Sequence, residues 1–157
     1  MTIWCSLVIG AYLSHAAVAQ SDLAWTVFRN GKDTTVQYPK GVFPLEDNEA
    51  KVTPPGHVFT TTDGRARLHV FAYRNDRNET PAQHLSRAFP SDRRALNYDR
   101  VTRTFFAVSQ NKGDRILYRR CNFADGLIHC IDLDYPRREE RAWDDIVTRI
   151  SLSLRPR

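Results

Sequence analysis

The sequence predicts an α+β domain in which a predominantly antiparallel β-sheet is flanked by two helices. Three observations lead to this fold class. Residues 115–135 alternate apolar and polar side chains as two strands do, with a turn signal between the halves. Residues 80–89 begin with a helix-capping pattern, and residues 136–154 carry apolar side chains at helical spacing. Strand-like segments precede the first helix and separate it from the second, an order typical of α+β domains.

The turn signal in 115–135 is Asp125-Gly126, which suits a type I′ turn because both central residues take positive φ. A two-residue loop places Cys121 opposite Cys130. A four-residue loop keeps that register, whereas a three-residue loop shifts it by one. Directly opposite Cα atoms in an antiparallel pair lie about 4.5–5.5 Å apart, a separation compatible with a disulfide. We therefore predict a Cys121–Cys130 disulfide; the alternative is two reduced structural thiols.

The same register predicts two different faces for this hairpin. Arg119 faces Asp132 on the side of the cysteines, where the two side chains can form a cross-strand ion pair. The opposite side is apolar and is the expected core face. Its residues are Ile116, Tyr118, Ile131, Leu133 and Tyr135.

The other strands are predicted from alternation and from the turn residues between them. They cover residues 21–30, 34–38, 57–61, 66–73 and 101–110. Both faces of 66–73 are partly apolar, which favours a central place in the sheet. Residues 40–56, rich in proline, glycine and acidic side chains, are expected to form a long surface loop. A polar connection is expected over residues 91–100.

The two helices have clear start signals and clear faces. The first begins with Thr80 as cap, Pro81 at the first helical position and Gln83 three residues after the cap, and Pro90 ends it. The last helix follows Pro136 and carries one apolar stripe. The residues of that stripe are Trp143, Ile146, Val147, Ile150 and Leu154.

The N-terminal segment, residues 1–19, is predicted to be a cleaved signal peptide. Residues 3–13 are apolar, and Ala17-Val18-Ala19 fits the small-x-small cleavage pattern. The apolar stretch is shorter than the roughly 20 residues that a membrane span needs. An uncleaved anchor and a buried N-terminal strand are the alternatives. The segment has no Lys or Arg, which a start codon upstream of Met1 would explain.

Cleavage after Ala19 would leave one domain, residues 20–157, with no transmembrane span. It would also remove Cys5 and leave an even number of cysteines, as an oxidising compartment favours. We therefore expect a periplasmic or secreted protein. Its formal net charge of +5 is modest and is compatible with an anionic partner.

No pattern in the chain indicates a catalytic, metal or cofactor site. The histidines are His15, His57, His69, His84 and His129, and no two lie two or four residues apart as zinc ligands often do. The serines lie in no nucleophile motif, and the seven glycines form no phosphate-binding loop. We predict no catalytic residue, no metal ligand and no cofactor.

Arginines concentrate in two segments and are interleaved with tyrosines, a pattern that can bind an anionic polymer. Acidic residues lie in the same segments, so ion pairing on a solvated face is the alternative. The candidate anion-binding residues are Arg93, Arg94, Arg119, Arg120, Arg137 and Arg138.

Several segments resemble a family of small exported bacterial proteins of unknown function. They are TTVQYPKGVF, FTTTDGRARLHVFAYRN, YDRV, the cysteine-bearing hairpin and the terminal amphipathic helix, and together they cover most of residues 20–157. In element order the chain is similar to the PsbP-like fold, an antiparallel sheet flanked by helices. That resemblance implies accessory and binding roles rather than one chemistry, and it transfers no ligand position.

The function that we expect is that of an exported, non-catalytic binding or accessory domain of unknown ligand. Its partner would be an envelope protein or an anionic polymer, bound at residues 40–56 or at an arginine-rich face, and we do not expect nucleic acid. The alternatives are a small periplasmic hydrolase whose Ser/His/Asp set assembles only in space, and a basic anion-binding surface protein.

Overall fold

The structure is a computed structural model that describes residues 23–31, 34–47, 51–89 and 95–156. The predicted signal peptide and its cleavage site lie outside the described residues. Among the helices of the described part, none is both long and apolar enough to cross a membrane.

The described chain forms strands with one helix between them and one near the end. The strands are β1 (Trp25–Asn30), β2 (Thr34–Pro39), β3 (Leu45–Asp47), β4 (His57–Thr60), β5 (Arg67–Arg74), β6 (Leu96–Val101), β7 (Phe105–Lys112), β8 (Arg115–Ala124), β9 (Leu127–Pro136) and β10 (Arg155–Pro156). The helices are α1 (Pro81–Ala88) and α2 (Glu140–Ser153), and a 3₁₀ turn (Arg137–Glu139) leads into α2.

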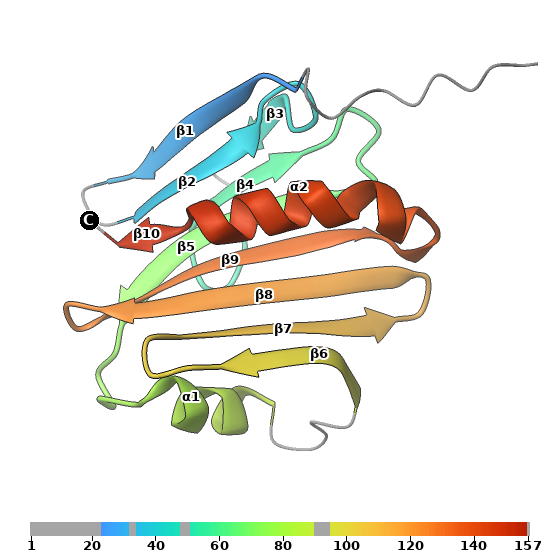
Figure 1. The fold of residues 1–157 in the computed structure, drawn as a ribbon. Helices are drawn as coiled ribbons and strands as arrows, with labels where there is room; N and C mark the ends of the chain where they lie inside the picture. Colours follow the sequence, from blue (N-terminus) through green and yellow to red (C-terminus); the bar gives the residue numbers. More distant parts are fainter. Residues whose placement is uncertain (1–22, 32–33, 48–50, 90–94, 157) are drawn as a thin grey trace, which may run out of the picture.

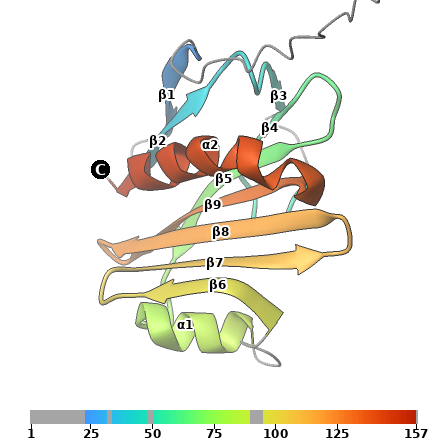
Figure 2. The same cartoon turned by 45° about the vertical axis from the view of Figure 1, so that its right-hand side comes forward.

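The described residues form two antiparallel sheets. The larger has the order β3-β4-β5-β9-β8-β7-β6, and the smaller has the order β1-β2-β10. Figures 1 and 2 show α2 lying over the larger sheet beside β9, with β1 and β2 beyond it, and α1 beside β6 and β7. Helix α2 packs on β2 and β9, whereas α1 packs on β7 and β8. The predicted class, an antiparallel sheet flanked by two helices, is confirmed.

The larger sheet separates two apolar clusters. The cluster under α2 includes the whole predicted stripe of that helix, which is at most 9% exposed, together with Ile131 and Leu133 of β9. The cluster under α1 includes Leu85, Phe71 and both cysteines of the hairpin. Because side chains alternate along a strand, β5, β9 and β8 each contribute to both clusters.

The β8–β9 hairpin has the predicted register. Cys121 pairs with Cys130 and Arg119 pairs with Asp132. Asp125 and Gly126 have φ of 51° and 73°, as the Asp-Gly turn requires. The sulfur atoms of the two cysteines lie 2.02 Å apart, at the distance of a disulfide bond.

Helix α1 begins with the predicted capping box. The Thr80 hydroxyl accepts a hydrogen bond from the Gln83 backbone N–H, and the Gln83 side chain accepts one from the Thr80 N–H. These bonds satisfy amide groups that the first turn of a helix leaves without partners. The cap fixes where α1 starts and therefore which part of the sheet it covers.

Four segments differ from the sequence-based prediction. The strand expected over 101–110 is divided, since Val101 ends β6 and Phe105 begins β7. The connection expected over 91–100 contains β6, an edge strand whose side chains are mostly exposed, so polar residues occupy it without cost. The loop expected over 40–56 contains β3, and its Phe43 is only 1% exposed. The two-residue strand β10 pairs with β2 after α2, and no pattern in so short a segment indicates it.

Candidate functional site: a pocket across β5, β9, β8 and β7

Two rows of side chains cross the larger sheet on the face away from α2. In the first row His69 of β5 pairs with Asp132, Asp132 with Arg119, and Arg119 with Val108 of β7. The second row lies two residues along each strand and runs through Arg67, Asp134, Leu117 and Gln110. Strand alternation puts both rows on one face.

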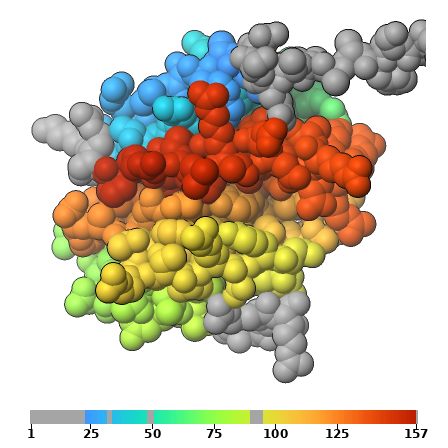
Figure 3. Space-filling view, in the orientation of Figure 1, coloured from blue at the N-terminus to red at the C-terminus, as the bar shows by residue number. Residues whose placement is uncertain are grey.

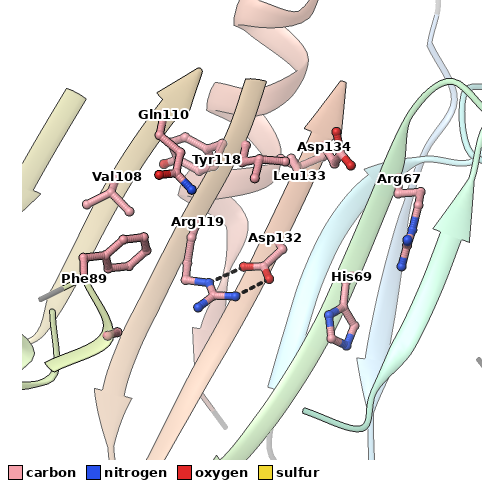
Figure 4. A pocket seen from close by; sticks show the side chains of 12 residues that line it. Arg67, His69, Phe89, Val108, Gln110, Tyr118, Arg119, Asp132, Leu133 and Asp134 are labelled. Carbon is pink, nitrogen blue, oxygen red and sulfur yellow. Dashed lines mark hydrogen bonds and ion pairs between the residues drawn. The ribbon is translucent and has the colours of Figure 1, made fainter. Parts of the chain in front are cut away.

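These rows form the floor of a half-open cavity of ≈ 330 Å³, and the end of α1 forms one wall. Helix α1 covers only the cysteine-bearing end of this face, so the other end stays accessible. Figure 4 shows Arg67 and His69 on one side of the floor, the Arg119–Asp132 pair in the middle, and Val108 and Phe89 on the other side. The pocket therefore has a polar end and an apolar end. Its lining residues are Arg67, His69, Ala88, Phe89, Val108, Gln110, Leu117, Tyr118, Arg119, Asp132, Leu133 and Asp134.

The centre of the floor is a two-bond ion pair. Arg119 donates from Nε to Oδ1 of Asp132 at 2.6 Å and from Nη2 to Oδ2 at 2.5 Å. The guanidinium also lies 5.7 Å from the ring centre of Phe71. The hydrogen bonds to Asp132 raise the pKa of Arg119 against the opposing effect of burial. The predicted cross-strand pair is therefore present, and it leaves this arginine already neutralised.

Arg67 is the cation of the pocket that has no carboxylate partner within the described residues. It stands opposite Asp134 in the register, but Arg115 occupies that carboxylate, with Nε 2.7 Å from Oδ1. Arg115 also donates to the backbone oxygen of Arg65 at 2.6 Å, which holds it outside the cavity. The positive charge of the polar end therefore comes from Arg67.

His69 lies two residues from Arg67 on β5 and lines the same pocket. Burial lowers the pKa of its imidazole, and the charges of Arg67 and Arg119 lower it further, whereas Asp132 raises it. The ring stacks on Phe71 with centroids 4.4 Å apart. Gly56 lies against the same ring and the β5 backbone, in a space with no room for a Cβ atom. The imidazole is thus held rigidly at the edge of the pocket.

Two other histidines, His84 and His129, contact hydroxyl groups, and both are buried in the interior. His84 of α1 lies between Glu79 (Oε2–Nδ1 2.8 Å) and Tyr73 (Oη–Nε2 3.0 Å). Burial raises the pKa of Tyr73, so its phenol is not poised to ionise. The Thr34 hydroxyl lies 2.8 Å from His129 Nδ1, and both residues are almost fully buried. Neither arrangement places a nucleophile in a cavity of the described residues that a substrate could reach.

The predicted anion-binding arginines are not brought together. Arg119 lies in the pocket, paired with Asp132, whereas Arg120 points to the opposite face of the sheet, towards α2. Arg137 and Arg138 are exposed in the turn before α2. Arg93 and Arg94 lie outside the described residues. Arg67 was missed as a site residue because only the pairing of β5 with the distant β9 places it opposite Asp134. Val108 and Gln110 were missed because no pairing register was derived from the sequence for β7 and β8.

No group of three or more histidine, cysteine or acidic side chains that could hold a metal ion occurs in the described part of the chain. The pocket itself contains one guanidinium without a carboxylate partner among the described residues, one amide side chain and an apolar wall.

Comparison with known proteins supports the fold alone. No protein-family model matches the chain, and no curated protein sequence is similar to it. Among solved structures, the solution structure of cyanobacterial PsbP (CyanoP) from Synechocystis sp. PCC 6803 is similar, with a TM-score of 0.63 over 86% of this chain and 94% of that chain. Their sequence identity is 11%. The PsbP-like fold predicted from the order of elements is confirmed.

Proposed function

We propose that this chain, whose fold is PsbP-like, is an exported binding or accessory domain that takes a small amphipathic carboxylate in the pocket across β5 to β7. The observation that carries the proposal is the division of the pocket. A guanidinium without a carboxylate partner lies at one end, an apolar wall at the other, and a neutralised ion pair between them. Such a site recognises a ligand by its two ends.

The chemistry of the lining favours binding over catalysis. No serine, threonine, cysteine or lysine is among the described residues that line the pocket. His69 could accept a proton, but a general base needs a nucleophile or an acidic proton within hydrogen-bonding reach. The hydrolase alternative therefore gains no support from the two histidine–hydroxyl contacts, which lie in the interior.

The length of the pocket limits the ligand. Adjacent strands lie about 4.8 Å apart, so Arg67 on β5 and Val108 on β7 are separated by roughly 14 Å across the sheet. A carboxylate at Arg67 would leave an aliphatic or aromatic body of several carbon atoms lying over the ion pair towards Val108 and Phe89. A bare inorganic anion would leave the apolar wall unused.

The export part of the proposal rests on the apolar N-terminal segment and on the cysteines at disulfide distance, which an oxidising compartment favours. The test is to express the full chain in a Gram-negative host and sequence the N-terminus of the protein from the periplasmic fraction. We expect Gln20 as the first residue. Full-length protein confined to the cytosol would overturn this part.

The binding part is tested by NMR titration of the purified domain with hexanoate and 3-phenylpropanoate, and with hexanamide as the uncharged control. We expect saturable shifts at the Val108 and Gln110 amides with the acids and much smaller ones with the amide. Arg67→Gln should weaken acid binding about tenfold or more, because it removes a charged hydrogen-bond donor.

Arg74→Gln is the matched control, since it removes an exposed arginine from the same strand outside the pocket. Equal weakening by both variants, or equal binding of the amide, would refute the proposed site. Hydrolysis of 4-nitrophenyl hexanoate that Arg67→Gln abolishes would instead favour the enzyme alternative.

A further inference from the structure

A second set of polar side chains stands on the opposite face of the sheet, beside α2. Tyr98 of β6 pairs with Ser109 of β7, and Ser109 pairs with Tyr118 of β8. In the adjacent row Arg100 pairs with Ala107, and Ala107 pairs with Arg120. We call these five side chains and the intervening Ala107 the β6–β8 site.

The cavity at the β6–β8 site lies over Ser109, a small side chain of β7, whereas Ala107 beside it is buried. Ser109 and Ala107 lie between large residues on both neighbouring strands, and those strands are roughly 10 Å apart. The cavity of ≈ 480 Å³ is bounded on one side by α2. In Figure 3 α2 and β6 lie on one face of the molecule, with part of β8 visible between them.

Two guanidinium groups face this space, held by one aromatic ring. The guanidinium carbon of Arg120 lies 4.0 Å from the ring centre of Phe105, and that of Arg100 lies 5.7 Å from it. Arg120 donates from Nε to the Asn122 side-chain oxygen at 3.0 Å, which leaves its other N–H groups free to turn to the cavity. Neither arginine forms an ion pair with a carboxylate of the described residues, unlike Arg119 and Arg115.

Such a pair of cations is costly unless an anion joins it. Burial lowers the pKa of Arg120, and the nearby Arg155 and Arg100 lower it further, while Tyr118 and Tyr98 act in the opposite direction. The half-buried Arg120 and the exposed Arg100 carry like charges, which repel each other. A bound oxyanion would relieve that repulsion and accept hydrogen bonds from both guanidinium groups.

The hydroxyl groups of the neighbouring row could add donors. The Tyr118 hydroxyl lies 2.6 Å from the Ser151 hydroxyl of α2, which fixes it at the boundary of the cavity. Tyr98 is 45% exposed, so its ring can contact the non-ionic part of a ligand.

The far end of the same cavity is acidic, which limits what can bind. Glu140 and Asp144 of α2 line that end beside Tyr135. Burial and these two carboxylates raise the pKa of Tyr135 to about 12. A polyanion lying along the cavity would bring its second charge towards the carboxylates and be repelled. A single anionic group with a neutral or cationic remainder would not.

We infer that the β6–β8 site binds one phosphate or sulfate group, through Arg100 and Arg120, of a ligand whose remaining part is neutral or cationic. The β6–β8 site and the carboxylate pocket use different arginines on opposite faces of the sheet, although Tyr118 borders both cavities. Among the described arginines that the sequence predicted to bind anions, Arg120 is the one that lines this cavity.

The test is NMR titration of the domain at low ionic strength with inorganic phosphate, inorganic sulfate, phosphoethanolamine and heparin. We expect saturable shifts at the Ala107 and Ser109 amides with the first three. Arg100→Gln and Arg120→Gln should each weaken binding about tenfold or more. Arg100 is exposed, so its variant keeps the test valid if Arg120→Gln folds poorly.

Arg149→Gln is the matched control. Arg149 also lies over an aromatic ring, with its guanidinium carbon 4.1 Å from the ring centre of Trp25, and it lies outside this cavity. Its replacement should leave phosphate binding unchanged, and so should Arg67→Gln in the carboxylate pocket.

Three results would overturn the inference. They are an absence of saturable binding to the wild-type protein, equal weakening by Arg149→Gln, and tighter binding of heparin than of phosphoethanolamine through Arg100 and Arg120. Because hexanoate binding is tested with Arg67→Gln and phosphate binding with Arg100→Gln and Arg120→Gln, failure of this site is distinguishable from failure of the carboxylate pocket.

Discussion

Replacing Gly56 with alanine should destabilise the fold, because no space exists for a Cβ atom. A Cβ built at this position would lie 2.5 Å from the backbone oxygen of Val70, 2.7 Å from Cβ of Phe71 and 2.8 Å from Nε2 of His69. Ordinary contacts of a Cβ atom are 3.4–4 Å. The first two neighbours belong to the central strand β5, which cannot move without disturbing its pairing with β4 and β9.

The segment at Gly56 must therefore move away from β5 in the Gly56→Ala variant. Forced overpacking of this kind costs about 1–3 kcal/mol, and we expect the upper part of that range because backbone atoms are involved. For a domain of this size the cost corresponds to a fall of roughly 6–12 °C in Tm. The same displacement would release the His69 ring from one of its contacts at the edge of the carboxylate pocket.

Urea unfolding followed by circular dichroism measures the change, with Gly41→Ala as the control. A Cβ at Gly41 meets nothing within 4 Å, so that variant should be neutral or slightly more stable than the wild type. Equal unfolding midpoints for Gly56→Ala and the wild type would refute the reasoning. They would mean that this segment does not lie against β5 in solution.

Three further outcomes are expected. Protein from the periplasm should show no alkylation of Cys121 or Cys130 by mass spectrometry, and alkylation of both would contradict the disulfide. Reducing the disulfide should lower the free energy of unfolding by about 2–3 kcal/mol, the chain-entropy value for a loop this short. Burial lowers the pKa of His69 and His84 in the fold, whereas unfolding returns each to about 6.5. Their stabilising contribution is therefore complete above about pH 6.5 and lost as the pH falls through the lower folded pKa; a urea midpoint unchanged from pH 7.5 to 5 would oppose it. Arg119→Gln should lower the free energy of unfolding by about 1 kcal/mol, because it leaves the half-buried carboxylate of Asp132 without its partner. Arg120→Gln should leave the urea midpoint unchanged or raise it, because it removes repulsion between like charges. A lower midpoint for Arg120→Gln than for Arg119→Gln would contradict this reasoning.

The parts of the fold that were predictable from the sequence are those fixed by neighbours in the chain. Asp125-Gly126 sets the hairpin register, and that register places Cys121 opposite Cys130. The cap at Thr80 and the apolar stripe of α2 are equally local signals. Strand β6 was missed because an edge strand needs no apolar alternation, and its residues 97–100 are polar or exposed.

The candidate site was mostly hidden because it depends on pairing between distant segments. His69 and Asp132 are opposite each other only because β5 pairs with β9, and no turn or spacing in the sequence specifies that pairing. The Arg119–Asp132 pair was predictable because both residues belong to one hairpin. The free cation, Arg67, could not be recognised without knowing that Arg115 takes the carboxylate opposite it.

Arg119 and Arg120 show why a cluster of charges in sequence is not a cluster in space. Adjacent residues of a strand point to opposite faces, so these two arginines enter different cavities. Arg119 meets Asp132 and is neutralised, whereas Arg120 meets Phe105 and Arg100 and keeps its charge available. The net charge of this sequence segment therefore does not reveal that Arg119 is paired with a carboxylate and Arg120 is not. A variant that removes both arginines would mix a loss of stability with a loss of anion binding, and only the single variants can separate the two sites.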